Sequence, residues 1–521
     1  MKEVNNVEDQ LQQADKVDEN QGSAPRTAKG KAKTSLSLMW VGATLVLCVL
    51  FILAGAPRVE AQGRDQTKSQ TIRQYTAILQ NVFDFIQKHY VDDVDPKSLY
   101  EGAMSGLLNA LGDPHSSFLG EKEMMDLTDT THGSFGGVGL YISKPLGENV
   151  NGKPAYVEVA SPIEDTPGWR AGINPGDLII QINGEPTDAL SMDDVLARLR
   201  GAPGADVKLL IRRGDKLEFP VTLTRAIIDV PTVKSAMIEN IGYLKLIQFT
   251  PRTVDRAKDA LAEFKARNYR GLILDLRNNP GGLLQAAVDI SDLFLDGGMV
   301  VSTKSRIPDE NAVFNATRSS VVPADMPVIV LINRGSASAS EIVAGALKDR
   351  GRAYLVGEKS FGKGSVQQVF PLDKSGFKLT IARYYTPSDV NIDKIGIPPD
   401  REVKFPEFTD KDAEKLKALI TANRIPTFAA ANPKATPADI QAFAGQLNRE
   451  YQLDAALLRR LIRDELNRTS IAPVYDLEYD VQLQEGIKII QSGTYKTLMQ
   501  STKTLKTLQE EANMEGMPLA S

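Results

Sequence analysis

Residues 328–342 read VIVLINRGSASASEI, an apolar run followed by a serine-rich loop and the start of a segment with helical spacing. The run Val328–Ile332 predicts a buried strand, and a helix is expected from Glu341 to Lys348. The same alternation extends through residues 227–405, where the pattern predicts further strands at Ile241–Gln248 and Gly271–Leu276 and helices at Val254–Ala266 and Leu283–Leu295. This alternation predicts an α/β core.

The composition is that of an ordinary globular chain. It has 521 residues, with 61 Lys and Arg against 66 Asp and Glu, and a net charge of −5. At roughly 150 residues per domain this length allows about three domains. The 42% hydrophobic content excludes wholesale disorder, and the near-neutral charge gives no electrostatic reason to expect nucleic acid as a partner. The single cysteine, Cys48, excludes an intramolecular disulfide and a cysteine-based metal site.

The N-terminal segment predicts a membrane anchor. Residues 1–35 form a polar tail that ends in a basic cluster, and residues 36–56 follow without a charged side chain. Such a run is long enough to cross a bilayer as a single transmembrane helix, and the basic flank favours a cytoplasmic N-terminus. The rest of the chain is then expected in the periplasm or another exported space, attached to the inner (cytoplasmic) membrane. A cleaved signal peptide is the alternative, because Val59-Glu60-Ala61 is a passable cleavage site.

Three further regions flank or interrupt the α/β core. Residues 71–130 are expected to be helical, because Tyr75, Ile78, Leu79, Val82, Phe85 and Ile86 recur at helical spacing. Residues 133–226 carry short β-type runs and one helix near Met192–Leu199, which predicts a β-rich domain. Residues 408–521 are expected to form a C-terminal helical region. A homo-oligomer assembled through the helical regions is compatible with this pattern.

A glycine turn opens the β-rich domain. Gly137-Val138-Gly139-Leu140 leads into a strand, and taken alone it indicates a tight hairpin. The same turn leaves backbone N–H groups free for an anion, and the strand edge can accept an extended peptide. With three later motifs, residues 133–226 resemble a PDZ domain: Arg170-Ala171-Gly172, Pro175-Gly176-Asp177 and Gln181-Ile182-Asn183-Gly184. The resemblance implies that a free C-terminal carboxylate binds at Val138–Leu140, with the last side chain between Leu140 and Ile142. Arg200 is either an exposed loop charge or a peptide-sensing contact.

The serine-rich loop has two interpretations. Ser338-x-x-Glu341 is a capping-box pattern, but a serine at a helix N-terminus also has free N–H groups beside it that suit an oxyanion. A serine nucleophile needs a base, and no histidine follows His132. Lys363, between Gly362 and Gly364, is the candidate, because a partly desolvated amine has a lowered pKa and can accept a proton. A lysine in an isolated Gly-Lys-Gly loop is otherwise usually solvated.

Taken together, these motifs resemble the signature of the C-terminal processing peptidases, or tail-specific proteases, which are PDZ-containing serine proteases with a Ser/Lys dyad. The resemblance spans about residues 71–405 and rests on Ser336–Ile342, Gly357-Glu358, Phe361–Gln367, Asp275–Gly282, Tyr385–Ser388 and Gly396–Asp400. It implies a protease core related to ClpP and crotonase in residues 227–405, with no metal or cofactor.

Carried onto this sequence, the resemblance implies that Ser338 is the nucleophile and Lys363 the base. Gln367 would orient the lysine amine. The N–H of Ala339 and that of Gly281 or Gly282 would form the oxyanion hole. The glycine that we expect after Ser388 is absent, since Asp389 stands there.

The sequence therefore predicts a multidomain α/β protein that is a membrane-anchored, exported serine endopeptidase. Its partners would be protein or peptide substrates with free apolar C-termini. The alternatives are a non-catalytic PDZ anchor or peptide-holding chaperone, and an exported scaffold assembled through the helical regions.

Overall fold

The computed structural model describes residues 70–514 except 145–148, 151–152, 164, 215–216, 319, 405–408 and 468–473. No helix within these ranges has the length and apolar character needed to span a membrane. The predicted span, residues 36–56, lies outside the described residues. The chain divides into two compact units, residues 1–99 and 100–521.

The first unit contains a helix over residues 70–89. The apolar side chains that predicted it stay largely exposed, including Tyr75 at 69%, Leu79 at 56% and Phe85 at 64%. Two more helices follow, α2 (Pro96–Asn109) and α3 (Glu121–His132), with a short strand, β1 (Ser117–Leu119), between them. Residues 71–130 thus contain mainly helices, and β1 was not predicted.

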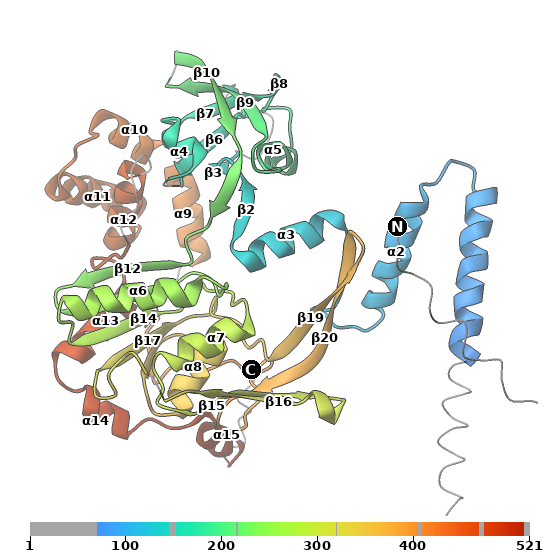
Figure 1. Cartoon of the computed structure of the whole chain (residues 1–521). Helices are drawn as coiled ribbons and strands as arrows, with labels where there is room; N and C mark the ends of the chain where they lie inside the picture. Colours follow the sequence, from blue (N-terminus) through green and yellow to red (C-terminus); the bar gives the residue numbers. More distant parts are fainter. Residues whose placement is uncertain are drawn as a thin grey trace, which may run out of the picture. The chain divides into compact units, whose positions relative to one another are not determined.

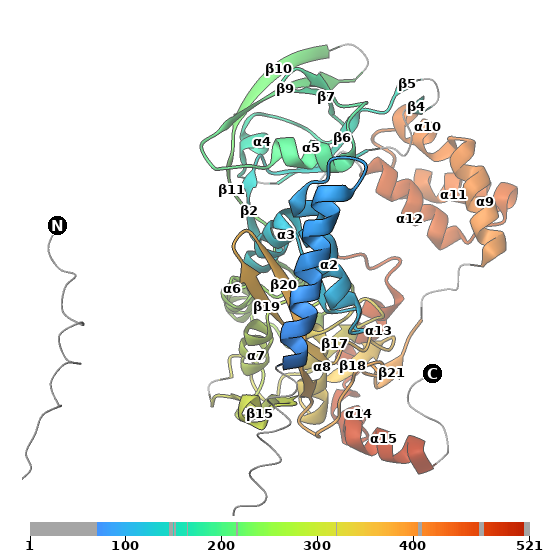
Figure 2. The same cartoon turned by 90° about the vertical axis from the view of Figure 1, so that its right-hand side faces the viewer.

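The β-rich domain is built on one antiparallel sheet with the strand order β10-β9-β7-β6-β3 (Figure 1). Its strands are β3 (Leu140–Ser143), β6 (Val157–Pro162), β7 (Leu178–Ile182), β9 (Asp206–Arg213) and β10 (Leu217–Thr224). The short β8 (Glu185–Pro186) pairs with β7, and the helices are α4 (Pro167–Arg170) and α5 (Met192–Leu199) (Figure 2). Separate two-stranded ribbons join β4 (Asn149–Val150) to β5 (Lys153–Pro154) and β2 (Ser134–Gly137) to β11 (Ala226–Asp229). In the main sheet β3 is an edge strand.

The core sheet has six strands in the order β12-β13-β14-β17-β18-β21. They are β12 (Val233–Ile238), β13 (Ile241–Leu246), β14 (Gly271–Asp275), β17 (Val328–Ile332), β18 (Tyr354–Gly357) and β21 (Arg401–Glu402). From β13 to β21 each strand pairs in parallel with its neighbour, and β12 is antiparallel. Parallel strands buried on both faces explain why β17 is apolar at every position.

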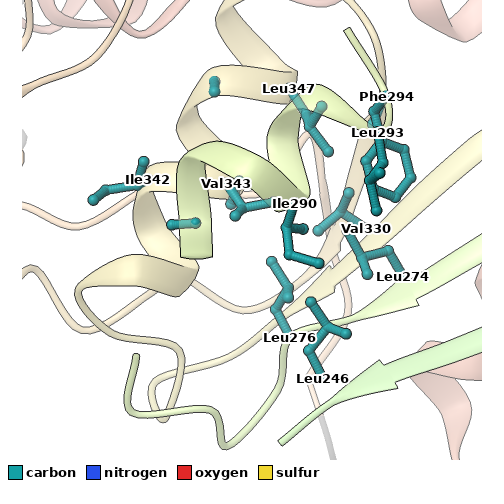
Figure 3. Close-up of a cluster of buried hydrophobic side chains, with 14 of the residues drawn as sticks. Leu246, Leu274, Leu276, Ile290, Leu293, Phe294, Val330, Ile342, Val343 and Leu347 are labelled. Atoms are coloured by element: carbon teal, nitrogen blue, oxygen red, sulfur yellow. The ribbon is translucent and has the colours of Figure 1, made fainter. Parts of the chain in front are cut away.

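Helices cover both faces of this sheet. On one face, α6 (Thr253–Ala266), α7 (Leu284–Asp292) and α8 (Ala339–Asp349) pack on alternate strand residues such as Leu274 and Val330 (Figure 3). On the other face, the intervening residues Ile273, Ile329 and Leu331 pack against Leu483 and Ile489 of α13 (Val481–Gln491). The C-terminal region thus supplies one layer of the core, which the sequence did not indicate.

A second sheet lies beside the core in the order β1-β20-β15-β16, with β19 on β20. It comprises β15 (Gly298–Ser305), β16 (Ala312–Ala316), β19 (Ser365–Leu372) and β20 (Ser375–Tyr385), and the turn η1 (Pro308–Glu310) precedes β16. The β19–β20 hairpin begins two residues after Lys363 and therefore carries the loop of the predicted base into this sheet.

The remaining C-terminal helices form two groups. The first has its own apolar core around Leu447 and Leu458 and consists of α9 (Asp410–Thr421), α10 (Arg424–Ala431), α11 (Pro437–Tyr451) and α12 (Ala455–Leu466). The second continues α13 with α14 (Tyr495–Gln500) and α15 (Leu505–Met514). The Leu505 side chain joins the core cluster beside α8, and its N–H donates to Asp349 Oδ1 at 2.7 Å.

Candidate active site

Ser338 lies at the start of α8 in a strained conformation, with φ 55° and ψ −114°. A residue with a β-carbon rarely adopts this backbone, and such strain concentrates at functional sites. The two neighbouring serines are fully buried and brace the loop: Ser336 Oγ donates to Leu276 O at 2.8 Å, and Ser340 Oγ donates to Asn279 O at 2.9 Å. Of the three serines, Ser338 is the one that is only half-buried.

The buried carboxylate of Glu341 holds the loop of Ser338 and the loop of Lys363 together. Its Oε2 accepts the N–H of Ser338 at 2.9 Å and the N–H of Lys363 at 2.9 Å. Its Oε1 accepts the Ser360 hydroxyl at 2.6 Å and the Gly362 N–H at 2.7 Å. Burial raises the pKa of Glu341, while these four hydrogen bonds oppose the rise. The sequence indicated Glu341 only as a helix cap.

A tyrosine makes a second link between the same two residues. The hydroxyl of Tyr384, a buried residue on β20, lies 3.3 Å from Ser338 O and donates to Lys363 O. Burial raises the pKa of Tyr384 far above its usual value, so the hydroxyl stays protonated and able to donate. The main chains of Ser338 and Lys363 are therefore joined through both their N–H and their C=O groups.

The Lys363 side chain is half-buried. Burial lowers its pKa, and the positive charge of Lys378 on β20 lowers it further, while the charges of Glu341 and Asp113 act in the opposite direction. A lysine in this setting releases its proton more readily than a solvated one. The amine can therefore act as a general base nearer to neutral pH.

The predicted oxyanion turn faces Ser338. Gly281 has φ 102°, and a β-carbon added there would lie 2.8 Å from Ser338 Cβ and 2.9 Å from Ala339 N. The Gly281 N–H donates to Asn279 Oδ1 at 2.9 Å. Within the described part of the chain, the N–H groups of Ala339 and Gly282 have no hydrogen-bond acceptor. Ala339 and Gly282 therefore each present an N–H group that is available to a ligand.

Gln367 lies on β19 beside a register shift in its pairing with β20. Its side-chain amide donates to Ser365 Oγ at 2.9 Å and to Thr380 Oγ1 at 3.2 Å. Its amide nitrogen is thus engaged within the hairpin, and no described hydrogen bond joins it to the Lys363 amine. The orienting role of Gln367 stays a prediction.

The predicted peptide groove lies at the edge strand β3. Leu140 and Ile142 are half-buried and pack against the core of the β-rich domain, beside the buried Val138. The Val138 carbonyl accepts the Gly168 N–H at 2.8 Å, which fixes the turn before β3. The free edge of β3 can accept an extended peptide as a further strand.

Gly137 and Arg200 lie just outside this groove. Gly137 ends β2 and pairs with Ala226 of β11. Arg200 donates to Asp126 Oδ1 of α3 at 2.7 Å, and its guanidinium lies 4.9 Å from the Phe135 ring centroid. The Arg200 charge is therefore paired with α3.

Comparisons with known proteins identify the fold and its chemistry. Residues 240–403 match the model of peptidase family S41, residues 158–213 match a PDZ domain, and residues 39–123 match the N-terminal domain of the activating protease CtpB. A carboxy-terminal-processing protease of Bartonella bacilliformis is 39% identical over 69% of this chain and 83% of its own length. This chain belongs to the carboxy-terminal processing proteases.

Two further processing proteases are similar over much of their length. That of Synechocystis sp. is 38% identical over 58% of this chain and 71% of its own, and CtpA of Bacillus subtilis is 33% identical over 63% and 69%. This processing protease is thus a serine-type peptidase with a PDZ domain, as its sequence predicted. Sequence reasoning missed the structural roles of Glu341, Tyr384 and Lys378, because each acts through a contact made only in the folded chain.

Proposed function

We propose that this processing protease is a membrane-anchored, exported endopeptidase that binds free C-termini on its PDZ domain and cleaves with a Ser338–Lys363 dyad. The observation that carries the proposal is the double link between Ser338 and Lys363, through the Glu341 carboxylate and the Tyr384 hydroxyl. The strained backbone of Ser338 and the lowered pKa of Lys363 support it further.

In this mechanism Ser338 Oγ attacks the scissile carbonyl and gives its proton to the neutral amine of Lys363. The N–H of Ala339 and an N–H of the Gly281-Gly282 turn stabilise the oxyanion that forms. When this tetrahedral intermediate collapses, Lys363 gives the proton to the nitrogen of the scissile bond. The C-terminal fragment then leaves as an amine, and an acyl-enzyme remains on Ser338. The same amine then activates the water that hydrolyses the acyl-enzyme. The carbonyl oxygen of Gln367 would accept a hydrogen bond from the amine and fix its direction.

Single substitutions test the dyad. Ser338→Ala and Lys363→Ala should each lower kcat by orders of magnitude on an unfolded protein that ends in apolar residues, followed by intact mass. Lys359→Ala, four residues upstream in the same loop, is the matched control and should cleave at the normal rate. Normal cleavage by Ser338→Ala would refute the dyad and favour another site.

The proposed role of the PDZ domain is tested by the substrate terminus. A peptide with an apolar free C-terminus should be cleaved with a higher kcat/KM than the same peptide amidated at its C-terminus. Leu140→Asp should remove this preference, because it places a negative charge in the apolar groove, which repels the substrate carboxylate. Equal cleavage of the two peptides by the unaltered protein would show that the carboxylate is not recognised.

The proposed anchor rests on the uncharged run at residues 36–56 and its basic flank. The full chain should sediment with membranes and resist extraction by high salt, whereas a chain lacking residues 1–56 should be soluble. N-terminal sequencing of the mature protein would separate a retained anchor from a cleaved signal peptide. A full chain found free in the cytoplasm would contradict export.

We also propose that the helix at residues 70–89 pairs with a second copy. Ile72, Tyr75, Leu79 and Val82 follow the alternating three- and four-residue spacing of a coiled-coil seam, and all four are exposed at 49–69%. Leu79→Lys should lower the mass measured by light scattering to that of one chain. An unchanged mass, or a single-chain mass for the unaltered protein, would exclude this pairing.

A further inference from the structure

The C-terminal region reaches the turn that faces the candidate nucleophile. Asp480 precedes α13 and lies well beyond residues 240–403, which match the peptidase family model. Its Oδ1 accepts the Leu483 N–H at 2.9 Å and so caps α13. The same carboxylate binds Arg277, which follows β14 of the core sheet. Asp480 therefore joins a helix outside the matched region to the end of a core strand.

Arg277 is buried, and its side chain is fully engaged. Nη1 and Nη2 each donate to one Asp480 oxygen at 2.7 Å, and Nη1 also donates to Gln482 Oε1 at 3.0 Å. Nε and Nη2 donate to the two oxygens of Asp275 at 2.9 and 2.6 Å. A guanidinium has five N–H donors, and all five have an acceptor here. Two of the five bonds depend on Asp480 and a third on Gln482, so the C-terminal region supplies most of them.

The turn that follows Arg277 lies against Ser338. Asn279 Nδ2 donates to Leu246 O at 2.9 Å, and Asn279 O accepts the Ala337 N–H at 3.0 Å, which ties the middle of the turn to β13 and to the serine loop. The turn ends at Gly281 and Gly282, and a β-carbon added at Gly281 would lie 2.8 Å from Ser338 Cβ. Arg277 is thus the fixed point at the beginning of the turn.

The structure also provides room for Arg277 to move. A cavity of about 460 Å³ borders the guanidinium, with polar walls that include Lys245, Asn278 and Asn333. Without Asp480, two donors of the buried guanidinium would be left without a partner, which is unfavourable. Turning the side chain into this cavity would solvate them and displace the turn that follows.

We propose that Asp480 is a positioning residue: by holding Arg277 it fixes the Asn278–Gly282 turn against Ser338 in the geometry that binds the oxyanion. This inference rests on the proposed function of Ser338 and extends the catalytic machinery into the C-terminal region. It assigns that region a part in the chemical step, beyond covering one face of the sheet.

The variant that tests this is Asp480→Asn in the full chain. Asparagine is as good a helix cap as aspartate, so α13 keeps its N-terminus while Arg277 loses its charged, bidentate partner. Because a displacement of about 1 Å in an active site can cost about 10²-fold, kcat on a fluorogenic peptide with an apolar C-terminus should fall 10- to 100-fold. KM should change less than threefold, since the peptide groove is untouched.

The matched control is Glu485→Gln. Glu485 lies on the same helix, is mostly buried and pairs with Arg401 at 3.0 Å, away from the turn. Glu485→Gln should lower the melting temperature less than Asp480→Asn, because Arg401 is half exposed, and it should leave kcat within twofold. Equal losses of kcat in both variants, or normal kcat in Asp480→Asn, would overturn the positioning role.

Ser338→Ala separates this inference from the proposed function. If Ser338→Ala is inactive while Asp480→Asn retains normal kcat, only the positioning role fails. If Ser338→Ala is active, the dyad itself fails. A double variant of Asp480→Asn with Gly281→Ala should be no slower than Gly281→Ala alone, because both act through the same turn. Additive losses would show that Asp480 acts by another route.

Discussion

The main-chain N–H groups of Ser338 and Lys363 donate to the same oxygen atom, Oε2 of Glu341, each at 2.9 Å. Two donors that share one acceptor must lie close together, so this carboxylate sets the separation of the two loops. Both bonds use main-chain groups, so they do not occupy the side chains of the two residues. Glu341 is therefore the residue on which the geometry of the candidate dyad depends most directly.

Glu341→Gln should separate the two loops. The substitution replaces one acceptor oxygen by an NH₂ group, which accepts no hydrogen bond, so in either amide orientation at least one buried N–H donor loses its partner. Leaving buried donors unpaired costs about 1–3 kcal/mol for each group. We expect a loss of at least 100-fold in kcat together with a lower melting temperature. A peptide cleavage assay measures kcat, and thermal unfolding of the same sample measures the melting temperature.

The control for Glu341→Gln is Glu263→Gln, which removes an exposed surface carboxylate that pairs with Arg267 at 3.6 Å. Exposed pairs of this kind contribute little to stability. Glu263→Gln should therefore behave as the unaltered protein. If Glu341→Gln also retained normal kcat, the shared carboxylate would be irrelevant to catalysis.

Tyr384→Phe removes the second link. The phenyl ring still fills the core, but the carbonyl of Lys363 loses its buried donor, and we expect about 1–2 kcal/mol less stability and a measurable fall in kcat. Tyr385→Phe, at the next position, is the matched control, because the Tyr384 hydroxyl alone lies between the two carbonyls. Urea unfolding with a parallel kcat measurement checks both effects. Equal behaviour of the two variants would remove Tyr384 from the site.

The pH dependence of cleavage should follow the Lys363 amine. A general base works in its neutral form, so kcat/KM should rise with pH through the pKa of Lys363, which burial and Lys378 place below the usual value. Lys378→Gln removes a positive neighbour, so the Lys363 pKa rises. The rising limb of the plot of kcat/KM against pH then moves to higher pH. Asp113→Asn removes a negative neighbour and should move the limb to lower pH.

Lys374→Gln is the control for these pH profiles. Lys374 lies in the same hairpin, is 72% exposed and pairs with Glu121 at 3.5 Å, so its loss should leave the limb in place. Lys378→Gln and Asp113→Asn are expected to shift the limb in opposite directions, so a general effect of mutation cannot produce both results. Shifts in the same direction, or none, would show that the limb belongs to another group.

Much of the core could be predicted because its signals are local. Val328–Ile332 is apolar throughout since β17 is buried on both faces, and its predicted bounds agree with the structure. The helix at Met192–Leu199 also agrees with its predicted bounds. In each case hydrophobic periodicity and capping residues fall within one element.

The parts that were missed depend on contacts between distant segments. β1 is a three-residue strand that exists because Phe118 pairs with Phe377 of β20. The helix α13 packs on the core sheet, but its periodicity does not reveal which surface it covers. Where a glycine is expected after Ser388, Asp389 adopts φ 63°, a backbone that aspartate tolerates better than most residues.

The site was predicted more fully in its reacting groups than in their supports. Ser338 and Lys363 stand out in the sequence because small residues surround them. Arg277 and Asn279 lie in the motif Asp275–Gly282, but the sequence does not reveal their partners Asp480 and Leu246, which lie far away in the chain. The direction of the Gln367 side chain likewise depends on the β19–β20 register, which the sequence does not reveal.

Gly281→Ala tests whether the oxyanion turn must touch Ser338. The added methyl group would lie 2.8 Å from both Ser338 Cβ and Ala337 O, closer than atoms tolerate, so the turn or the serine must move. We expect kcat to fall by about 10²- to 10³-fold, the usual cost of losing an oxyanion donor. Gly297→Ala is the matched control. Its φ of 86° carries a similar backbone strain, but the nearest atom would lie 3.6 Å away, so stability should fall while kcat stays normal. A normal kcat in Gly281→Ala would mean that this turn takes no part in the reaction.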